Sequence, residues 1–493
     1  MSIGKHIKEH AVLGIASSNY NVKSYGATGN GTTDDSVACQ AALDAAKAAG
    51  GGVVYFPVGT YLIGLLSDNG QTHNAKIKGG LKIGSNTTVQ GAGWGTVLKI
   101  AGASYTNTSW SKMPLLTNDD FAGGNSNIII RDMFLDGNRD EVVGFATEME
   151  GIDFVSVTNF LIENVYLEDV THDSIDLDLC ARGVINAIKV KNTVATNMWN
   201  GFHAGSTNSY MTVSNSYFEN CGLGRVDGNE AGLHNASSNA ITIGNHVVGC
   251  NRGIYHDGAV SNTVISGNLV EDTVTSMWGI QSRASYSNIV GNVVHGGAVT
   301  VQYGITLSDT TQGGTIVGNT IRANRQGIVA ASTGPVIVQS NTILGNPSVQ
   351  GILLDNGPHI CTGNSVEGKP SSSARGAIHA TADANGAQIK DNNISGASAG
   401  RGILSDADDV IITGNSITGI SSGGVEIDIA ATANDNIVAG NRIAAGTLGI
   451  NITSGSNRTN VYGNNLNGTT TDITDAGTAS QVAGATGAGA NIA

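Results

Sequence analysis

Short runs of alternating apolar and polar residues recur along the chain from about residue 150 onward. Most runs have the form Gly, aliphatic, any residue, apolar, any residue, and most successive runs begin 21 to 28 residues apart. The runs begin at residues 151, 174, 201, 232, 253, 279, 304, 327, 351, 376, 402, 424 and 449. Alternation with a period of two predicts β-strands, and a repeat of this length predicts units that stack on their neighbours.

A second marker lies between the runs: an apolar residue, two variable residues and an Asn, or a close variant. We expect this Asn to lie at a bend, where its side chain binds turn backbone and stacks on its copies in neighbouring coils. The residues are Asn215, Asn245, Asn268, Asn292, Asn319, Asn341, Asn364, Asn392, Asn415, Asn441 and Asn464. Both markers predict an all-β chain, a single right-handed parallel β-helix of about 12 to 14 coils.

One helix precedes the repeats. Ala residues at helical spacing predict a short helix over about 36–48, with Asp34 or Asp35 as its N-cap and three glycines at 50–52 as its end. We expect this helix to cap the open N-terminal end of the β-helix. The predicted domains are an N-terminal tail over 1–18, a catalytic β-helix over 19–470 and a C-terminal cap or tail over 471–493.

Composition narrows the function classes. The 493 residues include 69 Gly without a collagen period, and 40% hydrophobic residues suffice for a large core, which argues against disorder. A net charge of −14 without a Lys/Arg cluster argues against nucleic-acid binding, and no apolar stretch is long enough for a membrane span. The five scattered cysteines are expected to be buried. The first residues lack a signal-peptide core, so either a signal was removed before this numbering or the protein leaves its cell by lysis or not at all. We expect an extracellular or phage-particle-associated location.

Strand alternation turns the runs into a map of one face, because successive side chains point to opposite sides of a strand. Positions three and five of each run are expected to face solvent, and coils about 4.8 Å apart let residues in a column touch. The third positions are Asp153, Asp176, His203, His234, Tyr255 and Gln281, and the fifth positions include Asp178, Gly205, Ala236, Asp257 and Arg283. Later runs offer the chemically inert Thr306, Val329, Leu353 and Ile450.

Reactive side chains therefore concentrate in the first runs, where we expect the active site. The catalytic candidates are Asp176, Asp178, His203, His234 and Tyr255, and the substrate-binding candidates are Asp153, Asp257, Gln281 and Arg283. Gly205 and Ala236 are expected to leave a floor between Asp178 and Asp257 wide enough for a sugar ring. Each residue also has a structural alternative: solvated aspartates, stacked surface histidines, a packing tyrosine, and an Asp257–Arg283 ion pair.

The segment from Val22 to Ala27, with Gly31, Asp34 and Asp35, and the later GGGVVYFP-x-G-x-Y from Gly50 to Tyr61 resemble the opening of the pectate-lyase-like superfamily. That superfamily includes phage tailspike depolymerases, polygalacturonases and mannuronan C5-epimerases. The coils from about 150 to 270 are similar to the catalytic modules of alginate C5-epimerases and related lyases. The resemblance implies a glycan that runs along one face of the β-helix and is cut or modified there.

The chain departs from the reaction motifs of this superfamily. The epimerase signature Asp-Pro-His-Glu falls on Asp176-Leu177-Asp178-Leu179, where only the Asp matches, and Asp173 stands where the family has its catalytic Tyr. The polygalacturonase motifs Asn-Thr-Asp and Gly-His-Gly are absent.

The favoured function is a polysaccharide lyase that acts by β-elimination on a uronate-containing glycan such as alginate or pectate, and the resemblance carries most of this preference. His203 or His234 would be the base and Tyr255 the acid. Arg283, or a calcium ion bound by Asp153, Asp176 and Asp178, would neutralise the uronate carboxylate.

Two other functions remain open. In a glycoside hydrolase, Asp176 and Asp178 would lie with Cβ atoms roughly 7 Å apart, a separation that suits an inverting acid and base, and Asp257 offers a further partner. A C5-epimerase or a non-catalytic glycan-binding tail-fibre protein is the third class. Because tailspikes of this fold are often trimers, the resemblance also suggests a homotrimer.

Overall fold

The computed structural model describes residues 19–64, 68–73, 75–102, 111–141, 148–192, 199–223, 230–258, 260–271, 273, 278–296, 303–308, 312–322, 325–345, 349–367, 375–396, 400–420, 424–444 and 446–483. Over these residues the chain is nearly all β, a right-handed parallel β-helix of about 15 turns with one short α-helix. The predicted fold class is confirmed. The turns outnumber the runs because coils before residue 150 carry no Gly-aliphatic run.

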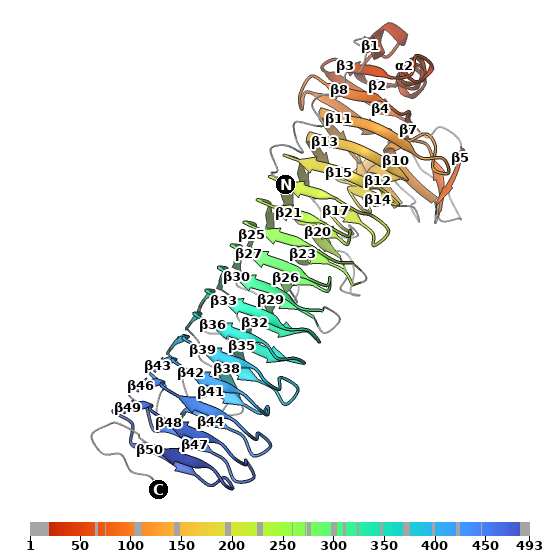
Figure 1. Cartoon of the computed structure of the whole chain (residues 1–493). Helices are drawn as coiled ribbons and strands as arrows, with labels where there is room; N and C mark the ends of the chain where they lie inside the picture. Colours follow the sequence, from red (N-terminus) through yellow and green to blue (C-terminus); the bar gives the residue numbers. More distant parts are fainter. Residues whose placement is uncertain are drawn as a thin grey trace. The chain divides into compact units, whose positions relative to one another are not determined.

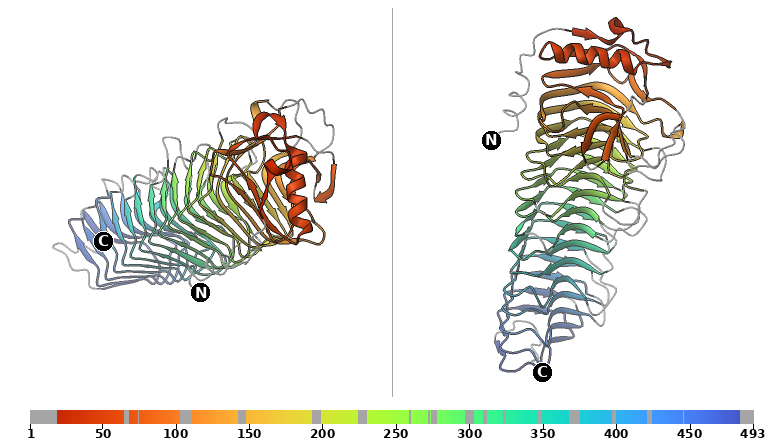
Figure 2. Two further views of the ribbon diagram at one scale, coloured as in Figure 1. Left: turned by 90° about the horizontal axis from the view of Figure 1, so that it is seen from above. Right: turned by 90° about the vertical axis from the view of Figure 1, so that its right-hand side faces the viewer.

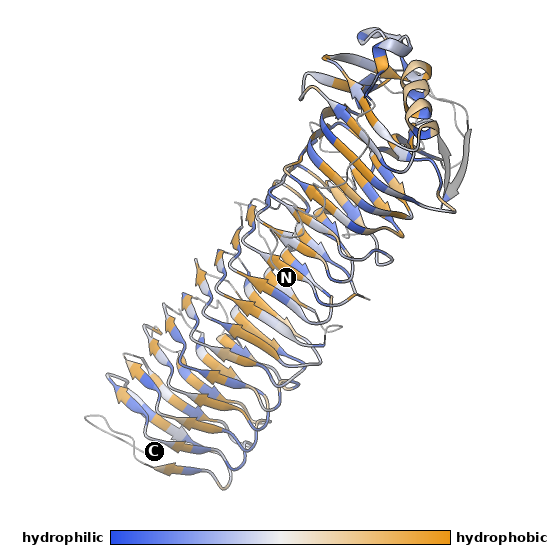
Figure 3. Ribbon diagram, turned by 45° about the horizontal axis from the view of Figure 1, so that its top comes forward, coloured by the Kyte–Doolittle hydropathy of each residue, from blue (hydrophilic) through white to orange (hydrophobic). Residues whose placement is uncertain are grey.

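The chain divides into two compact units, residues 1–255 and 256–493, and each is described by itself. In both units a typical coil gives one strand to a first sheet and two shorter strands to a second sheet. Strands of successive coils pair in parallel, in chain order (Figure 1). Hydrophobic and hydrophilic positions alternate along these strands, so that one set of side chains fills the interior (Figure 3).

The first unit opens with short elements around a single helix. These elements are β1 (Asn19–Asn21), the 3-10 helix η1 (Val22–Tyr25), β2 (Asn30–Asp34), α2 (Ser36–Ala48), β3 (Gly52–Phe56), β4 (Gly59–Ile63) and β7 (Leu81–Ile83). The α2 bounds agree with the predicted helix. Asp34 accepts a hydrogen bond from the Ser36 N–H at 3.0 Å, whereas Asp35 binds the backbone of the loop before β2. The contacts of α2 with β3 and β7 place it over the first coils of this unit (Figures 1 and 2).

A sheet of parallel strands, which we call the site sheet, carries the predicted active-site residues of the first unit. Its strands are β10 (Ser111–Asn118), β12 (Glu148–Val155), β14 (Ile175–Asp178), β17 (Phe202–Ala204), β20 (Ala231–Asn235) and β23 (Arg252–His256). An antiparallel hairpin of β5 (Asp68–His73) and β6 (Ala75–Lys78) joins this sheet, because β6 pairs with β10.

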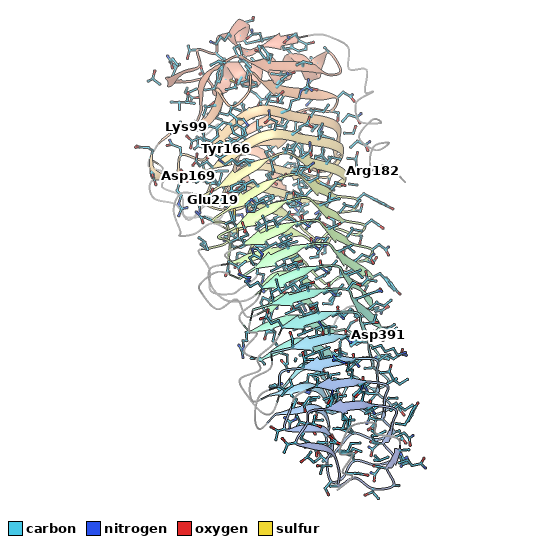
Figure 4. The ribbon with its side chains drawn as sticks, turned by 90° about the vertical axis from the view of Figure 1, so that its left-hand side faces the viewer. Lys99, Tyr166, Asp169, Arg182, Glu219 and Asp391 are labelled. Carbon is cyan, nitrogen blue, oxygen red and sulfur yellow. The ribbon has the colours of Figure 1, made fainter. Side chains whose placement is uncertain are left out.

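The second sheet of the first unit presents an aromatic column on its outer face. It includes β11 (Asn125–Asp136), β13 (Val157–Glu168), β16 (Lys189–Lys191), β19 (Tyr217–Glu219) and β22 (His246–Val248), whose register aligns Phe134, Tyr166, Lys189, Tyr217 and His246. The Phe134 and Tyr166 ring centroids lie 4.6 Å apart, and Lys189 Nζ lies 5.0 Å from the Tyr166 centroid. Tyr166 lies on the same side of the unit as Lys99 and Glu219 (Figure 4). The column is a ladder of stacked side chains on a sheet that carries none of the predicted site residues.

The first sheet of the second unit continues the same coil pattern. Its strands are β26 (Trp278–Ser282), β29 (Tyr303–Leu307), β32 (Gln326–Ala331), β35 (Gln350–Asp355), β38 (Gly376–Ala380), β41 (Arg401–Ser405), β44 (Val425–Ile429), β47 (Leu448–Ile452) and β50 (Thr471–Asp475). Ile residues at the second position of each run stack through the interior and are fully buried or nearly so.

The register of this sheet corrects three runs. Ile378 pairs with Ile403, and Ile403 pairs with Ile427, so the run placed at 376 is shifted by one residue and the run placed at 424 by two residues. Asn451 pairs with Asp428 and therefore occupies the third position that was assigned to Ile450. The outer column of the second unit carries Thr306, Val329 and Leu353, as expected, but then His379, Asp428 and Asn451, so the expectation of inert residues is wrong for the later coils. A Gly followed by Ala or Val can match the five-residue pattern before the true start of the run, so the pattern alone does not determine the register of these strands.

The predicted Asn ladder forms in the second unit. Asn364 Nδ2 donates to Asn392 Oδ1 at 2.9 Å and to the Val338 carbonyl at 2.9 Å, and the Asn341 N–H donates to Asn364 Oδ1 at 2.9 Å. The same pattern links Asn268, Asn292, Asn319, Asn341, Asn364, Asn392, Asn415, Asn441 and Asn464. Each of these follows a residue in the left-handed region, such as Gly363 at φ 65°.

Asn215 is an exception to the ladder. It is exposed and itself adopts a left-handed conformation, at φ 51°, and Ser216 instead donates its N–H to Asn245 Oδ1 at 3.0 Å. The marker in that coil is therefore displaced by one residue.

Parallel pairing continues past residue 470, since β50 pairs with β47 and β51 (Gln481–Ala483) pairs with β48 (Asn460–Tyr462). The predicted domain boundaries at 18 and 470 remain predictions, and the segments 1–18 and 484–493 lie outside the described residues. All five cysteines are buried, as predicted. In the described part of the chain, no helix has the length and apolar character to cross a membrane.

Candidate active site

The register of the site sheet aligns the predicted third-position residues of the first unit. Asp153 pairs with Asp176, Asp176 with His203, His203 with His234, and His234 with Tyr255. Five strands thus bring residues from widely separated segments into one column. What each residue can do depends on its contacts and its exposure.

The column is far less exposed than strand alternation predicts. Asp153 and Tyr255 are 1% exposed and Asp176 is 4% exposed, whereas the His203 side chain is 26% exposed. The expectation that third positions face open solvent is wrong for the two aspartates and the tyrosine, because charged side chains of the same and neighbouring coils pack over them. Of these four side chains, His203 is the one that a substrate can reach.

Lys112, in β10, lies at the centre of the buried charges. Its Nζ contacts Asp176 Oδ2 and lies 3.2 Å from Glu150 Oε1 and 4.0 Å from Asp153 Oδ1. Burial alone would lower the pKa of Lys112, but the carboxylates of Glu150, Asp176 and Asp153 outweigh burial and raise it above its ordinary value. The lysine is therefore a permanent cation beneath the column.

His203 and Asp176 form a hydrogen-bonded dyad. His203 Nδ1 donates to Asp176 Oδ1 at 2.7 Å, and Lys112 holds the second Asp176 oxygen. Burial alone would raise the pKa of Asp176, but Lys112 and His203 outweigh it and hold that pKa well below its ordinary value. Burial alone would lower the pKa of His203, but the Asp176 hydrogen bond and charge raise it to about 9. His203 is thus protonated at neutral pH, and its Nε2–H remains for a further acceptor.

Two further carboxyls lie below the dyad. Glu150 is fully buried, and burial raises its pKa; burial and then the charge of Glu150 raise the pKa of Asp153. Among the described residues, Glu150 Oε2 and Asp153 Oδ2 have no hydrogen-bond partner. The cluster therefore contains more carboxyl groups than Lys112 can neutralise, and retained protons offset part of the surplus negative charge.

A second layer fixes the neighbouring coil. Asp173 Oδ1 accepts hydrogen bonds from Asn200 N at 2.7 Å and Asn200 Nδ2 at 2.9 Å. His172 Nδ1 lies 3.2 Å from Glu150 Oε1 and 3.3 Å from Asp173 Oδ2, and the Trp199 ring covers His172 with centroids 4.0 Å apart. Asp173, which stands at the family's tyrosine position, is thus buried and engaged in structural hydrogen bonds.

Asp178 lies at the accessible side of the cluster. Its side chain is 19% exposed, and burial followed by the charge of Asp176 raises its pKa above the ordinary value. Asp178 Oδ2 lies 3.2 Å from His73 Nε2, which comes from the β5–β6 hairpin. A Cβ at Gly205 would lie only 3.1 Å from Asp178 Oδ1, so glycine keeps that oxygen uncrowded. The predicted floor of Gly205 and Ala236 for a sugar ring remains a prediction.

His234 and Tyr255 continue the column as a stack. The His203 and His234 ring centroids lie 4.9 Å apart, and the His234 and Tyr255 centroids 4.6 Å apart. Arg252 covers the Tyr255 ring, with its Cζ 4.4 Å from the centroid. Because Tyr255 is buried in this stack, the geometry favours packing over direct proton donation to a substrate.

Three predicted substrate-binding residues belong to the second unit. Arg283 Nη1 lies 3.5 Å from Asp257 Oδ1, so these two form the ion pair that is their structural alternative. Gln281 is 7% exposed.

Among the residues that the structure describes, three carboxylate-rich groups converge closely enough to hold a metal ion: Glu150–His172–Asp173, Asp173–Asp176–His203 and Glu150–Asp153–Asp176. The predicted calcium ligands Asp153, Asp176 and Asp178 do not fit such an ion. Lys112 and His203 engage both oxygens of Asp176, and the Lys112 ammonium already lies where a cation between Asp153 and Asp176 would lie. The group Glu150–His172–Asp173 includes a histidine, and the group Asp173–Asp176–His203 includes a histidine and the engaged Asp176. Calcium instead favours several oxygen ligands.

Sequence reasoning missed Lys112, Glu150, His172 and His73. Lys112 and His73 lie before the first run, where no repeat marks their position. Glu150 directly precedes the Gly of the first run, as Asn200 precedes that of the third. The position before Gly is therefore a signal that could have found Glu150.

Residues 19–255 match the family model described as rhamnogalacturonase A/epimerase, pectate lyase-like. The first unit is a member of the pectate-lyase-like superfamily. Residues 290–492 match the family model of the periplasmic copper-binding protein NosD.

Several curated relatives of this chain come from Azotobacter vinelandii. It is 36% identical over 162 residues to mannuronan C5-epimerase AlgE6, which is 31% of this chain and 17% of that protein. It is also 36% identical over 167 residues to alginate lyase 7, which is 32% of this chain and 18% of that protein. The chain thus spans less than a fifth of the length of either relative.

Solved structures show the same fold. The N-terminal fragment of gene product 12 of bacteriophage Phi29 superimposes with a TM-score of 0.52 at 15% identity, over 94% of this chain and 91% of that one. The tailspike protein of E. coli bacteriophage HK620, solved in complex with a pentasaccharide, gives a TM-score of 0.51 at 14% identity, over 93% and 77%. At these identities the likeness concerns the fold alone.

Proposed function

We propose that the protein is a carbohydrate-active enzyme that removes the C5 proton of a uronate in a polysaccharide and completes a β-elimination, as a polysaccharide lyase. The observation that carries the proposal is the His203–Asp176–Lys112 chain. It holds a cationic imidazole at the surface of an otherwise buried charge cluster. The similarity to mannuronan C5-epimerases and to an alginate lyase supports a uronate as the substrate.

The reaction needs an acid, a base and a cation. Because the pKa of His203 is about 9, this residue serves as the acid that protonates the leaving glycosidic oxygen, and not as the base that the sequence predicts. Asp178 has a raised pKa and an uncrowded Oδ1, and it accepts the C5 proton. The C5–H electron pair forms the C4=C5 double bond as the C4–O bond breaks. Exchange with solvent then returns both groups to their starting states.

Hydrolysis by the Asp176–Asp178 pair is less well supported. A hydrolytic base must be able to activate water, and both Asp176 oxygens are already engaged by Lys112 and His203. Epimerisation remains the closest alternative, because it shares proton removal at C5 and differs in whether a proton returns to that carbon.

The test uses the full chain with polymannuronate, polyguluronate, pectate and a neutral glucan. We expect ultraviolet absorbance of an unsaturated uronate and new reducing ends to rise together on a polyuronate. His203→Ala should reduce the rate about 100-fold or more, whereas His246→Ala, a partly exposed histidine on the other sheet of this unit, should not. We expect EDTA to leave the rate unchanged, because the Lys112 ammonium lies where a metal ion between Asp153 and Asp176 would lie.

Other outcomes identify the alternatives. Reducing ends without absorbance would mean hydrolysis, and deuterium at C5 from heavy water without chain cleavage would mean epimerisation. Loss of activity with EDTA that calcium restores would support the calcium prediction. Silence on every substrate would favour a glycan-binding protein. An extracellular or phage-associated location and a homotrimer remain predictions that accompany this proposal.

A further inference from the structure

His73 reaches the site sheet from a part of the first unit that lies outside the coil repeat. It is the last residue of β5, and the antiparallel pairing of β5 with β6 sets this hairpin apart from the parallel coils. The hairpin is fixed by main-chain pairing of β6 with β10, in which Lys112 pairs with Ile77. The strand that supplies Lys112 therefore also positions the hairpin that supplies His73.

The contact of His73 with Asp178 spans 105 residues of sequence, at 3.2 Å between Nε2 and Oδ2. The two side chains are 24% and 19% exposed. A partly exposed pair of this kind adds only about 0–1 kcal/mol to stability, and strand pairing already anchors the hairpin. Stability alone thus gives little reason for this pair.

The pair repeats the chemistry of the dyad beside it. Asp176 and Asp178 lie two residues apart in β14, and each is bound by one imidazole: His203 for Asp176 and His73 for Asp178. Asp176 is buried and has both oxygens engaged, whereas Asp178 is bound by His73 through Oδ2 and has Gly205 beside Oδ1. Asp176 therefore has no carboxylate oxygen left for a substrate, whereas Asp178 keeps Oδ1 available.

We propose that His73 is a positioning residue of the active site: it holds Asp178 by Oδ2 so that Oδ1 faces the C5 proton of the bound uronate. This inference rests on the proposed function. Hydrogen bonding at Oδ2 fixes the rotation of the carboxylate, and a misplaced base costs large factors in rate because proton transfer needs close alignment.

The charge of His73 gives a second, independent signature. Burial and the charge of Asp176 raise the pKa of Asp178, whereas the charges of His203, Lys112 and His73 lower it. Without His73, the pKa of Asp178 rises. The acid limb of the profile of kcat/KM against pH then moves to higher pH, because a base must be ionised to act.

The experiment compares His73→Ala, His73→Gln and His295→Ala in the full chain on the polyuronate that the wild type cleaves. His295 is the control: an exposed histidine, 3.6 Å from Glu271 in the second unit. We expect His73→Ala to lose about 10- to 100-fold in kcat with little change in KM. Its acid limb should move upward. His73→Gln, which keeps a donor but no charge, should recover part of kcat and keep the shifted limb.

Circular dichroism and the unfolding midpoint confirm that the variants fold. A wild type that cleaves while His73→Ala keeps its kcat and acid limb would overturn this inference and leave the proposed function intact. A wild type inert on every polyuronate would overturn both. If His73→Ala and His73→Gln fell equally in kcat with no shift of the limb, His73 would act through folding of the hairpin, and the positioning role would be wrong.

Discussion

Single residues of this protein owe their chemistry to what is buried beside them. His203 is an ordinary imidazole in the sequence, and it becomes an acid because Asp176 accepts from Nδ1 and Lys112 keeps Asp176 ionised. The charge of one buried lysine is thus transmitted through a carboxylate to a partly exposed histidine. Removing the carboxylate should change both the rate and its dependence on pH.

We expect Asp176→Asn to lower kcat/KM about 100-fold. It should also move the alkaline limb of the pH profile, which lies near the His203 pKa of about 9, to lower pH. The sign follows because the Asp176 hydrogen bond and charge favour imidazolium, so their loss lowers the pKa of His203. The profile is measured from pH 6 to 10. Asp406→Asn is the control, since Asp406 Oδ2 lies 2.8 Å from His379 Nε2 in the other unit. An alkaline limb unmoved in Asp176→Asn would exclude His203 as the acid.

Glu426 shows the same dependence on surroundings in the second unit. It occupies the register position of Gly402 and Gly449, is fully buried, and neither carboxylate oxygen has a partner among the described residues. Burial raises its pKa from the ordinary 4.5 to about 8. Between these values the folded chain holds a proton that the unfolded chain has lost. Stability should therefore fall as pH rises through this window, by at most about 1.4 kcal/mol per pH unit.

Glu426→Gln removes this titration. We expect urea unfolding midpoints of the variant to depend less on pH between 5 and 8 than those of the wild type. Glu367→Gln, an exposed glutamate at the end of β37 (Ser365–Glu367), should leave the wild-type dependence unchanged. If the unfolding midpoints of the wild type and of Glu426→Gln depended on pH in the same way, the Glu426 carboxyl would have a hydrogen-bonding partner in the folded protein.

At the scale of the element, the coil is held by hydrogen bonds that its own backbone cannot make. Each ladder Asn gives its amide to the next Asn and to a strand carbonyl, and its carbonyl oxygen accepts from the preceding coil. The ladder therefore satisfies the bend of one coil with the side chain of another. Loss of one ladder Asn therefore leaves buried polar groups without a partner in the coils before and after it.

Asn364→Ala should destabilise the second unit by about 1–3 kcal/mol, the cost of leaving buried donors and acceptors unpaired. The measurement is the free energy of unfolding from urea titration. Asn393→Ala supplies the control, because Asn393 is exposed in β40 (Asn393–Ser395) and should cost less than about 0.5 kcal/mol. Equal effects in the two variants would mean that the ladder stabilises no more than a surface Asn.

At the scale of the whole molecule, net charge opposes the proposed substrate. The chain carries −14 and a polyuronate is itself an anion, so long-range repulsion should slow their encounter at low salt. Salt screens such repulsion, with a Debye length of about 10 Å at 0.1 M. The buried cations of the site act only on groups in contact with them, so they do not reverse the long-range repulsion between the protein and the polyuronate.

We therefore expect kcat/KM on a long polyuronate to rise severalfold between about 0.01 M and 0.15 M NaCl, where the screening length shortens from about 30 Å to 8 Å. A uronate tetrasaccharide, with fewer charges, should show a weaker rise. The rates are measured from the initial absorbance at constant pH. A fall in kcat/KM with salt would mean that a local cationic surface, and not the net charge, guides the substrate.

The amino-acid sequence determined the coil, the ladder and the column, because each follows from a local period. Alternation sets which side chains of a strand share a face, and a fixed repeat places Asp153, Asp176, His203, His234 and Tyr255 in register. The capping helix was equally readable, since its spacing and its glycine stop are local. The register of the later runs could not be predicted, because Ala377 and Glu426 stand at the first position, where most runs have Gly.

Only the tertiary structure decided which members of the column can react. Lys112 meets Asp176 across 64 residues and His73 meets Asp178 across 105, and no periodic signal links such positions. Exposure separates His203 from the buried Asp153 and Tyr255, and it depends on the side chains that pack over each coil. The proton affinities of the cluster follow from that burial and those contacts, so charge state and accessibility emerge only when the distant segments meet.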